Sequence, residues 1–101
     1  MEDCIFCKIV KKQISTQFVK ETNDFVVFAD INPAAPTHLL IIPKQHHEDL
    51  LTITNEVWQG VRYVALELQK QLALPGFRLE NNVGTMAAVK HFHVHFKAGI
   101  K

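Results

Sequence analysis

The sequence contains few of the residues that define unusual protein classes. Four glycines and four prolines in 101 residues leave no low-complexity tract and no linker. No apolar run approaches the roughly 18 residues of a membrane-spanning helix, so we expect no membrane contact. The net charge is only +1, which argues against a basic module that binds nucleic acid. Hydrophobic residues make up 48%, enough for the core of one domain over residues 1–101.

Only two cysteines are present, Cys4 and Cys7, and they form a C-x-x-C pair near the first residue. No signal peptide precedes them, so we expect a cytoplasmic protein without a structural disulfide. A redox pair normally follows a strand in a βαβ unit, which this pair does not. Two interpretations stay open. The pair is half of a zinc site, because thiolates are preferred zinc ligands, or it packs a first helix.

Hydrophobic periodicity predicts two helices and five strands. A short helix is expected from an Asp3 cap to about Lys11. The main helix is expected after a Thr54 cap, with an apolar stripe of Val57, Val61, Val64, Leu68 and Leu72. Strands are expected over 18–21, 25–30, 37–42, 77–81 and 89–96. Strands joined by short turns favour an α+β fold, here with a five-stranded antiparallel sheet.

Histidine is abundant, with six in the chain and three within five positions. On a strand over 89–96, His91, His93 and His95 would share one face, about 6.6 Å apart. A hydrophobic core does not need three imidazoles, since each buried one requires a hydrogen-bond partner. Two chemistries suit the row: metal binding, or nucleophilic attack on phosphorus by a neutral imidazole. His38, on the buried strand 37–42, is expected to face the same kind of site.

Together with four further segments, this row resembles the histidine triad family in its Hint-like branch of phosphoramidases. The matching segments are Cys4–Ile9, Asp30–His38, Ile42–His46, Asn81–Gly84 and the triad His91–Phe96. The resemblance implies a histidine triad fold and hydrolysis of purine nucleoside phosphoramidates, such as AMP linked to an amine. It implies that His93 attacks the phosphorus and becomes nucleotidylated, that His38 and His95 assist, and that water then releases the monophosphate.

The resemblance also implies substrate contacts, a metal site and a homodimer. Asp30 would hold the ribose hydroxyls and Asn82 would lie beside the phosphate. The apolar slot for the base would comprise Ile5, Phe6, Ile9, Phe28 and Ile31. A structural zinc ion would be bound by Cys4, Cys7, His46 and His91, which leaves His93 and His95 for the phosphate and His47 on the surface. The dimer would join sheets and main helices, with Trp58 and Val61 at the interface.

The sequence departs from the family pattern just before the triad. Residues 85–90 stand where relatives carry a Gly-Gln phosphate segment, and Ala87 and Ala88 offer no side-chain donor for a developing oxyanion. Lys97 breaks the apolar end of the motif and, like Lys90, is expected on the surface. The C-terminal tail of many relatives is also expected to be missing. Two alternatives therefore stay open: a nucleotide-binding module with little catalysis, and a zinc-dependent interaction protein.

Overall fold

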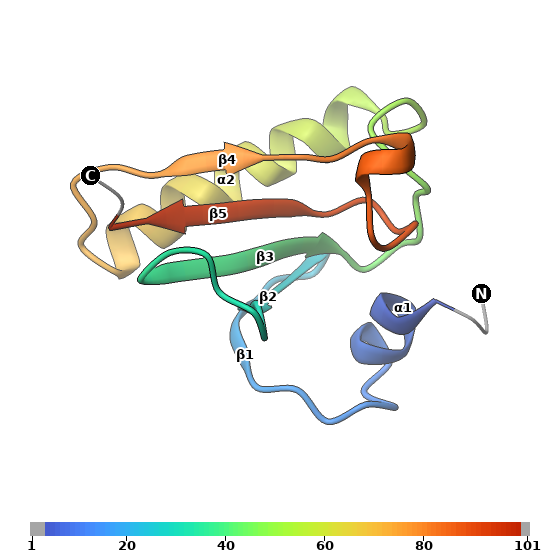
Figure 1. The fold of residues 1–101 in the computed structure, drawn as a ribbon, viewed down its shortest axis with the longest axis horizontal. Coiled ribbons are helices and arrows are strands. Elements are labelled where there is room, and N and C mark those ends of the chain that lie inside the picture. Colours follow the sequence, from blue (N-terminus) through green and yellow to red (C-terminus); the bar gives the residue numbers. More distant parts are fainter. Residues whose placement is uncertain (1–3, 100–101) are drawn as a thin grey trace.

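The computed structural model describes residues 4–99, whose five strands form one antiparallel sheet in the order β1-β2-β3-β5-β4 (Figure 1). The strands are β1 (Phe18–Glu21), β2 (Phe25–Ala29), β3 (Thr37–Pro43), β4 (Arg78–Glu80) and β5 (Val94–Ala98). The helices are α1 (Ile5–Val10) and α2 (Asn55–Gln71), and a 3₁₀ turn, η1, spans Gly84–Met86. The predicted α+β fold with one main and one short helix is confirmed.

The main helix α2 covers one face of the sheet with the predicted apolar stripe (Figure 1). The Thr54 hydroxyl caps it, accepting the Val57 N–H at 3.3 Å. Gly60 is required where the helix passes β2, because a Cβ there would lie 2.4 Å from the Phe25 ring. Leu72 ends the helix as its C-cap and is 38% exposed, so the predicted stripe stops one turn earlier.

A second core cluster lies on the opposite face of the sheet, beneath α1. Successive residues of a strand point to opposite faces, so β2 and β3 contribute alternate side chains to the two clusters. The second cluster comprises Phe6, Ile9, Val26, Phe28, Leu40 and Ile42. The prediction that β3 is buried on both faces is therefore confirmed.

The first helix begins one residue later than expected. Its N-cap is Cys4, whose Sγ accepts the Cys7 N–H at 3.3 Å. The predicted cap, Asp3, lies outside the described residues. Because the capping side chain is that of Cys4 and its partner is the Cys7 N–H, the two cysteines lie close together at the N-terminal end of α1.

The predicted fifth strand over 89–96 is wrong in its boundaries. The strand starts at Val94, and only from there does burial alternate. Before it, the Phe92 N–H donates to the His47 carbonyl at 2.6 Å, outside the sheet. His91 and His93 therefore precede the strand, and of the three triad histidines only His95 lies on it. The strand also continues to Ala98, paired with Thr37 at the start of β3.

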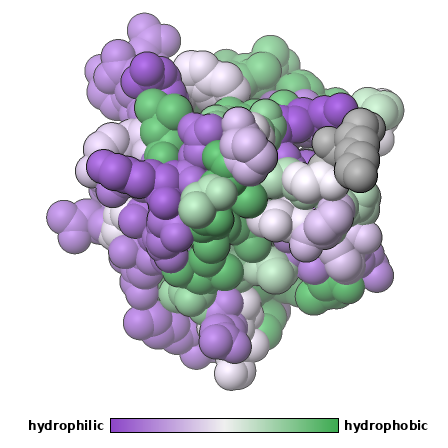
Figure 2. All heavy atoms as spheres, turned by 90° about the vertical axis from the view of Figure 1, so that its left-hand side faces the viewer, coloured by the Kyte–Doolittle hydropathy of each residue, from purple (hydrophilic) through white to green (hydrophobic). Residues whose placement is uncertain are grey.

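Hydrophobic side chains reach the surface in several places. Figure 2 views the molecule from the left of Figure 1 and shows them as a band bordered by hydrophilic residues. On α2, Trp58 is 45% and Tyr63 61% exposed, whereas Val61 is completely buried in the core. Val61 therefore cannot form the predicted dimer contact, and Trp58 can. Among residues 4–99, no helix is both long and apolar enough to cross a membrane.

Candidate metal site and imidazole cluster

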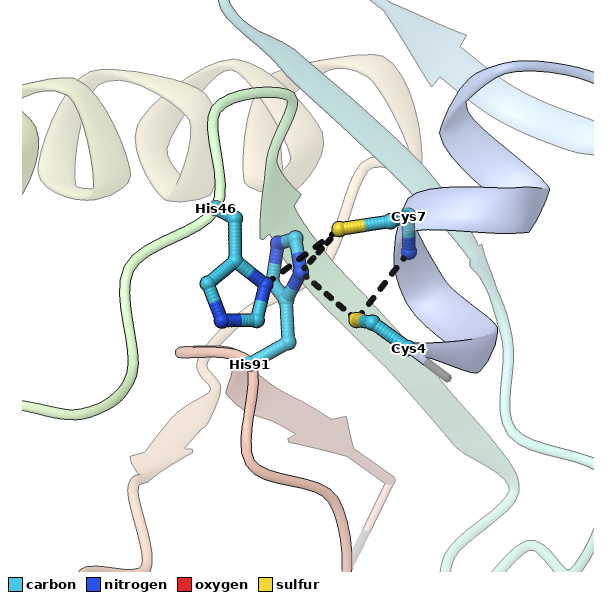
Figure 3. A group of neighbouring side chains, drawn as sticks. All are labelled: Cys4, Cys7, His46 and His91. Carbon is cyan, nitrogen blue, oxygen red and sulfur yellow. Dashed lines mark hydrogen bonds between the residues drawn. The ribbon is translucent and has the colours of Figure 1, made fainter. Parts of the chain in front are cut away.

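Four side chains from three separate parts of the chain meet at the start of α1 (Figure 3). Cys4 is the N-cap of α1 and Cys7 lies in its first turn, His46 comes from the loop after β3, and His91 from the segment before β5. Their ligand atoms all lie within 4.8 Å of one another. Three sulfur-to-Nδ1 distances are 3.2 Å (Cys4–His91), 3.2 Å (Cys7–His46) and 3.4 Å (Cys7–His91). A tetrahedral zinc ion separates its sulfur and nitrogen ligands by about 3.5 Å, so the four predicted ligands fit a metal ion.

The protonation of His91 also suits a metal. Its Nε2–H donates to the Pro43 carbonyl at 2.9 Å, which leaves the Nδ1 lone pair facing the two sulfur atoms. Burial lowers the pKa of His91 to about 4, so the ring stays neutral, as a ligand must. Burial and the neighbouring Cys4 thiol raise the pKa of Cys7, and a bound cation would oppose that shift.

A second cluster, built from Asp30, His38 and His95, lies on the α1 face of the sheet. His38 on β3 and His95 on β5 approach at 2.9 Å, from Nε2 to Nδ1. Asp30 follows β2, and its Oδ2 lies 3.4 Å from His38 Nε2 and 3.9 Å from His95 Nδ1. Its other oxygen accepts the Asn32 N–H at 2.9 Å, which fixes the loop after β2. Three predicted site residues thus meet.

Hydrogen bonds determine which nitrogen carries each proton in this cluster. The Ala34 N–H donates to His38 Nδ1 at 2.9 Å, so the neutral His38 ring carries its proton on Nε2. That proton is donated to His95 Nδ1, and neutral His95 therefore carries its own proton on Nε2. A metal ion on His38 Nε2 would require a proton on Nδ1, where the Ala34 N–H already points. The cluster is thus a hydrogen-bonded relay and does not fit a metal ion.

His93 is held beside this relay with one ring nitrogen free. Its Nδ1–H donates to the His91 carbonyl at 2.7 Å, which leaves a lone pair on Nε2. The centre of its ring lies 5.2 Å from that of His95 and 5.0 Å from that of Phe6, and the Phe6 and His93 rings meet edge to face. His93 is only 6% exposed, and burial lowers its pKa although the His91 carbonyl opposes the shift. The arrangement presents a neutral, desolvated imidazole with a lone pair that can act as a nucleophile.

His95 places an N–H donor on the ring next to His93. The pKa of His95 is lowered mainly by burial and, to a smaller extent, by the neighbouring His93 and His38 imidazoles. A neutral His95 with Nδ1 occupied by His38 presents only its Nε2–H to a ligand. An N–H donor beside an imidazole lone pair can stabilise charge that develops on a phosphoryl group or on its leaving atom.

The residues predicted to contact the base separate into two environments. Phe6, Ile9 and Phe28 are buried in the core cluster beneath α1, where the Phe6 and Phe28 rings meet edge-on at 5.9 Å. Ile5 and Ile31 are 48% and 91% exposed. The exposed pair is available to a ligand, whereas each of the buried three is only 6–7% exposed. Asn82, predicted beside the phosphate, is half-buried.

Three polar contacts near the triad were not anticipated. The Asn81 amide donates through Nδ2 to the His93 carbonyl at 2.8 Å; Asn81 belongs to the matching segment Asn81–Gly84, but no role was predicted for it. Lys97, predicted on the surface, has a side chain only 18% exposed and pairs with Glu80 at 2.7 Å, which lowers the pKa of Glu80. Lys90 is exposed, as expected, but its ammonium donates to the Gly84 carbonyl. His47, also predicted on the surface, is half-buried.

Comparison with known proteins identifies the family. Residues 3–99 match the family described as scavenger mRNA decapping enzyme C-term binding. Protein HitA of Neisseria gonorrhoeae is 41% identical over 99 residues, spanning 94% of this chain and 92% of its own. Adenosine 5'-monophosphoramidase HNT1 of Saccharomyces cerevisiae is 39% identical over 93 residues, spanning 92% of this chain and 59% of its own. A histidine triad protein structure from Clostridium difficile aligns with a TM-score of 0.94 at 36% identity, covering 100% of this chain and 94% of that one. The chain therefore belongs to the histidine triad family.

Proposed function

We propose that this protein hydrolyses purine nucleoside phosphoramidates, such as AMP linked to an amine, through a covalent intermediate on His93. The observation that carries the proposal is the proton arrangement around the three imidazoles. His93 Nε2 has a free lone pair, and its neighbour His95 has Nε2–H as its donor. The name of the yeast relative, an adenosine 5'-monophosphoramidase, supports this reaction class.

The first step is attack of His93 Nε2 on the phosphorus. The P–N bond breaks, its electron pair goes to the departing nitrogen, and that nitrogen takes up a proton from solvent while His95 Nε2–H donates a hydrogen bond that stabilises the developing charge. His93 is then bound to the nucleotide as a cationic phosphoryl-imidazolium, because Nδ1 keeps its proton for the His91 carbonyl. In the second step water attacks the phosphorus and loses a proton to solvent, and His93 leaves as a neutral imidazole that keeps its Nδ1 proton. Two substitutions replace one difficult displacement.

The surrounding residues fit the remaining parts of a nucleotide. Asp30 is a half-buried carboxylate beside the relay, and a carboxylate accepts hydrogen bonds from both ribose hydroxyls. Ile31 next to it, and Ile5 on α1, are exposed apolar side chains that suit a purine face. Phe6, Ile9 and Phe28 belong to the core cluster beneath α1 and would form the buried part of the base site. Asn82 is assigned to the phosphate side of the site.

The cysteine and histidine cluster is assigned to a structural zinc ion bound by Cys4, Cys7, His46 and His91. When bound, the ion joins α1 to the loop after β3 and to the segment before β5, which adds binding free energy to folding. We also propose that the protein forms a homodimer in which the exposed Trp58 of α2 is covered. A light-scattering mass of one chain would contradict the dimer.

The activity is tested by steady-state turnover of a fluorogenic AMP-amine substrate. His93→Ala is expected to lower kcat by orders of magnitude, because it removes the nucleophile on which both steps of the proposed reaction depend. Asn23→Ala, in the exposed hairpin turn, serves as the matched control and should retain full turnover. Unchanged turnover by a folded His93→Ala protein would refute the mechanism.

A second candidate function follows from residues 84–90. This segment consists of η1, where Met86 is 73% exposed, followed by a bend at residues 88–90. Ala87 and Ala88 offer no side-chain donors to a phosphoryl oxygen, and the Lys90 ammonium is engaged by the Gly84 carbonyl. A site with weak oxyanion stabilisation would bind a nucleotide and turn it over slowly. Calorimetry with AMP beside the turnover assay separates the two: binding without hydrolysis favours a nucleotide-binding module.

A further inference from the structure

The strand pair β4 and β5 ends just before the nucleophile. The last paired residues are Glu80 on β4 and His95 on β5. Beyond them, the backbone of Asn81 and that of Val94 would form the next pair of the ladder. The Asn81 side chain replaces that pairing, because its Nδ2–H donates to the His93 carbonyl at 2.8 Å. A side-chain amide thus continues the ladder where the backbone stops.

The carbonyl that Asn81 holds belongs to the nucleophile itself. The peptide group joining His93 to Val94 sets the direction in which the His93 side chain leaves the backbone. On the other side, Phe92 is tied to the loop after β3 through its N–H and the His47 carbonyl, at 2.6 Å. The His93 ring is then oriented by its bond to the His91 carbonyl. Asn81 is the tether on the strand side of the nucleophile.

The oxygen of the Asn81 amide also indicates that the residue is there to hold His93. Its Oδ1 is buried and has no hydrogen-bond partner among residues 4–99. An unpaired buried acceptor destabilises the fold, so a side chain that only filled space here would be apolar. Rotating the amide would place Oδ1 against the His93 carbonyl, two acceptors in contact. The amide is therefore retained for the one bond it makes to His93.

We infer that Asn81 is a positioning residue for the nucleophile, and this inference rests on the proposed function. It fixes the His93–Val94 peptide so that His93 Nε2 faces the phosphorus when the substrate binds. Because Asn81 acts through His93, its loss should change the chemical step and not the affinity. A displacement of about 1 Å in a reacting group can cost on the order of 100-fold in rate.

The test compares Asn81→Leu, which keeps the size without a donor, with Asn81→Asp, which keeps the shape as an acceptor. Asn23→Asp, in the exposed hairpin turn, is the matched control. Both Asn81 variants should lower kcat about 10- to 100-fold and leave KM within about two-fold, with the control unchanged. Wild-type kcat in a folded Asn81→Leu protein, or a raised KM with unchanged kcat, would overturn the inference. If neither variant folds, Asn81→Ser is measured by the same criteria.

A spectroscopic readout separates this inference from the proposed reaction. In wild-type protein, the ¹⁵N shifts of His93 should report a single tautomer with the proton on Nδ1. In Asn81→Leu, they should move toward an average of two tautomers, because the ring loses its fixed distance to the His91 carbonyl. Unchanged ¹⁵N shifts would overturn the positioning role. If the wild-type protein turns over no phosphoramidate, the proposed function fails, and the ¹⁵N shifts still decide the role of Asn81.

Discussion

Removal of the metal is expected to destabilise the protein because the four ligands join distant parts of the chain. The contact between Cys7 and His91 closes a loop of 84 residues. For a cross-link of that span, the chain-entropy relation gives about 4.5 kcal/mol at 25 °C. This is an upper value, since a metal bond is reversible and the unfolded chain retains some affinity for zinc. A domain of this size loses about 4–8 °C in Tm per kcal/mol, so the shift is on the order of 20 °C.

The assay is thermal unfolding followed by circular dichroism, with zinc-loaded, chelator-treated and Cys7→Ser proteins side by side. The loaded protein should melt highest, and the other two should melt at similar, lower temperatures. Adding the chelator to Cys7→Ser is the matched control and should change its Tm little, because the site is already broken. Equal Tm values for the loaded and chelated wild-type protein would refute the reasoning that a metal ion joins these segments.

Three further outcomes follow from the described contacts. Gly60→Ala should destabilise the protein by about 1–3 kcal/mol in urea titrations, because its Cβ would meet the Phe25 ring at 2.4 Å; an unchanged midpoint would show that α2 shifts freely. His38→Phe should lower kcat about 10- to 100-fold at unchanged Tm, because His95 loses the donor that fixes its tautomer; full activity would contradict the relay. Burial lowers the pKa values of His93 and His95 from 6.5, and both rings stay neutral above those lowered values. The acid limb of the kcat/KM profile should therefore fall below pH 6.5, and a limb above that value would contradict the burial argument.

Much of the fold follows from periodicity, because each main element buries a regular set of side chains. The stripe of α2 and the apolar run of β3 both meet the core as their spacing predicts. The start of β5 could not be predicted in this way. His91–Phe96 alternates in sequence beyond the strand, since His91 is buried by the cysteines and Phe92 by the main core. Alternation of polar and apolar residues indicates which side chains are buried. It does not indicate which groups the backbone N–H groups bond to, and those bonds define where a strand starts.

The site was predictable only in parts. Cys4 and Cys7 share one end of a helix by their spacing, but their partners lie 39 residues away at His46 and 84 residues from Cys7 at His91. No periodicity connects such distant positions, and only the family resemblance paired them. The Ala34 N–H that fixes the His38 tautomer is a backbone group, so side-chain identity carries no signal for it.

The central claim, that His93 is the nucleophile, is tested most directly by trapping the covalent intermediate. Wild-type protein and His93→Ala are mixed with an AMP-amine substrate, quenched within milliseconds, and digested for peptide mass mapping. The account predicts one AMP attached to the wild-type peptide at His93 and no adduct in the variant. An adduct on another residue, or wild-type turnover by the folded His93→Ala protein, would contradict it.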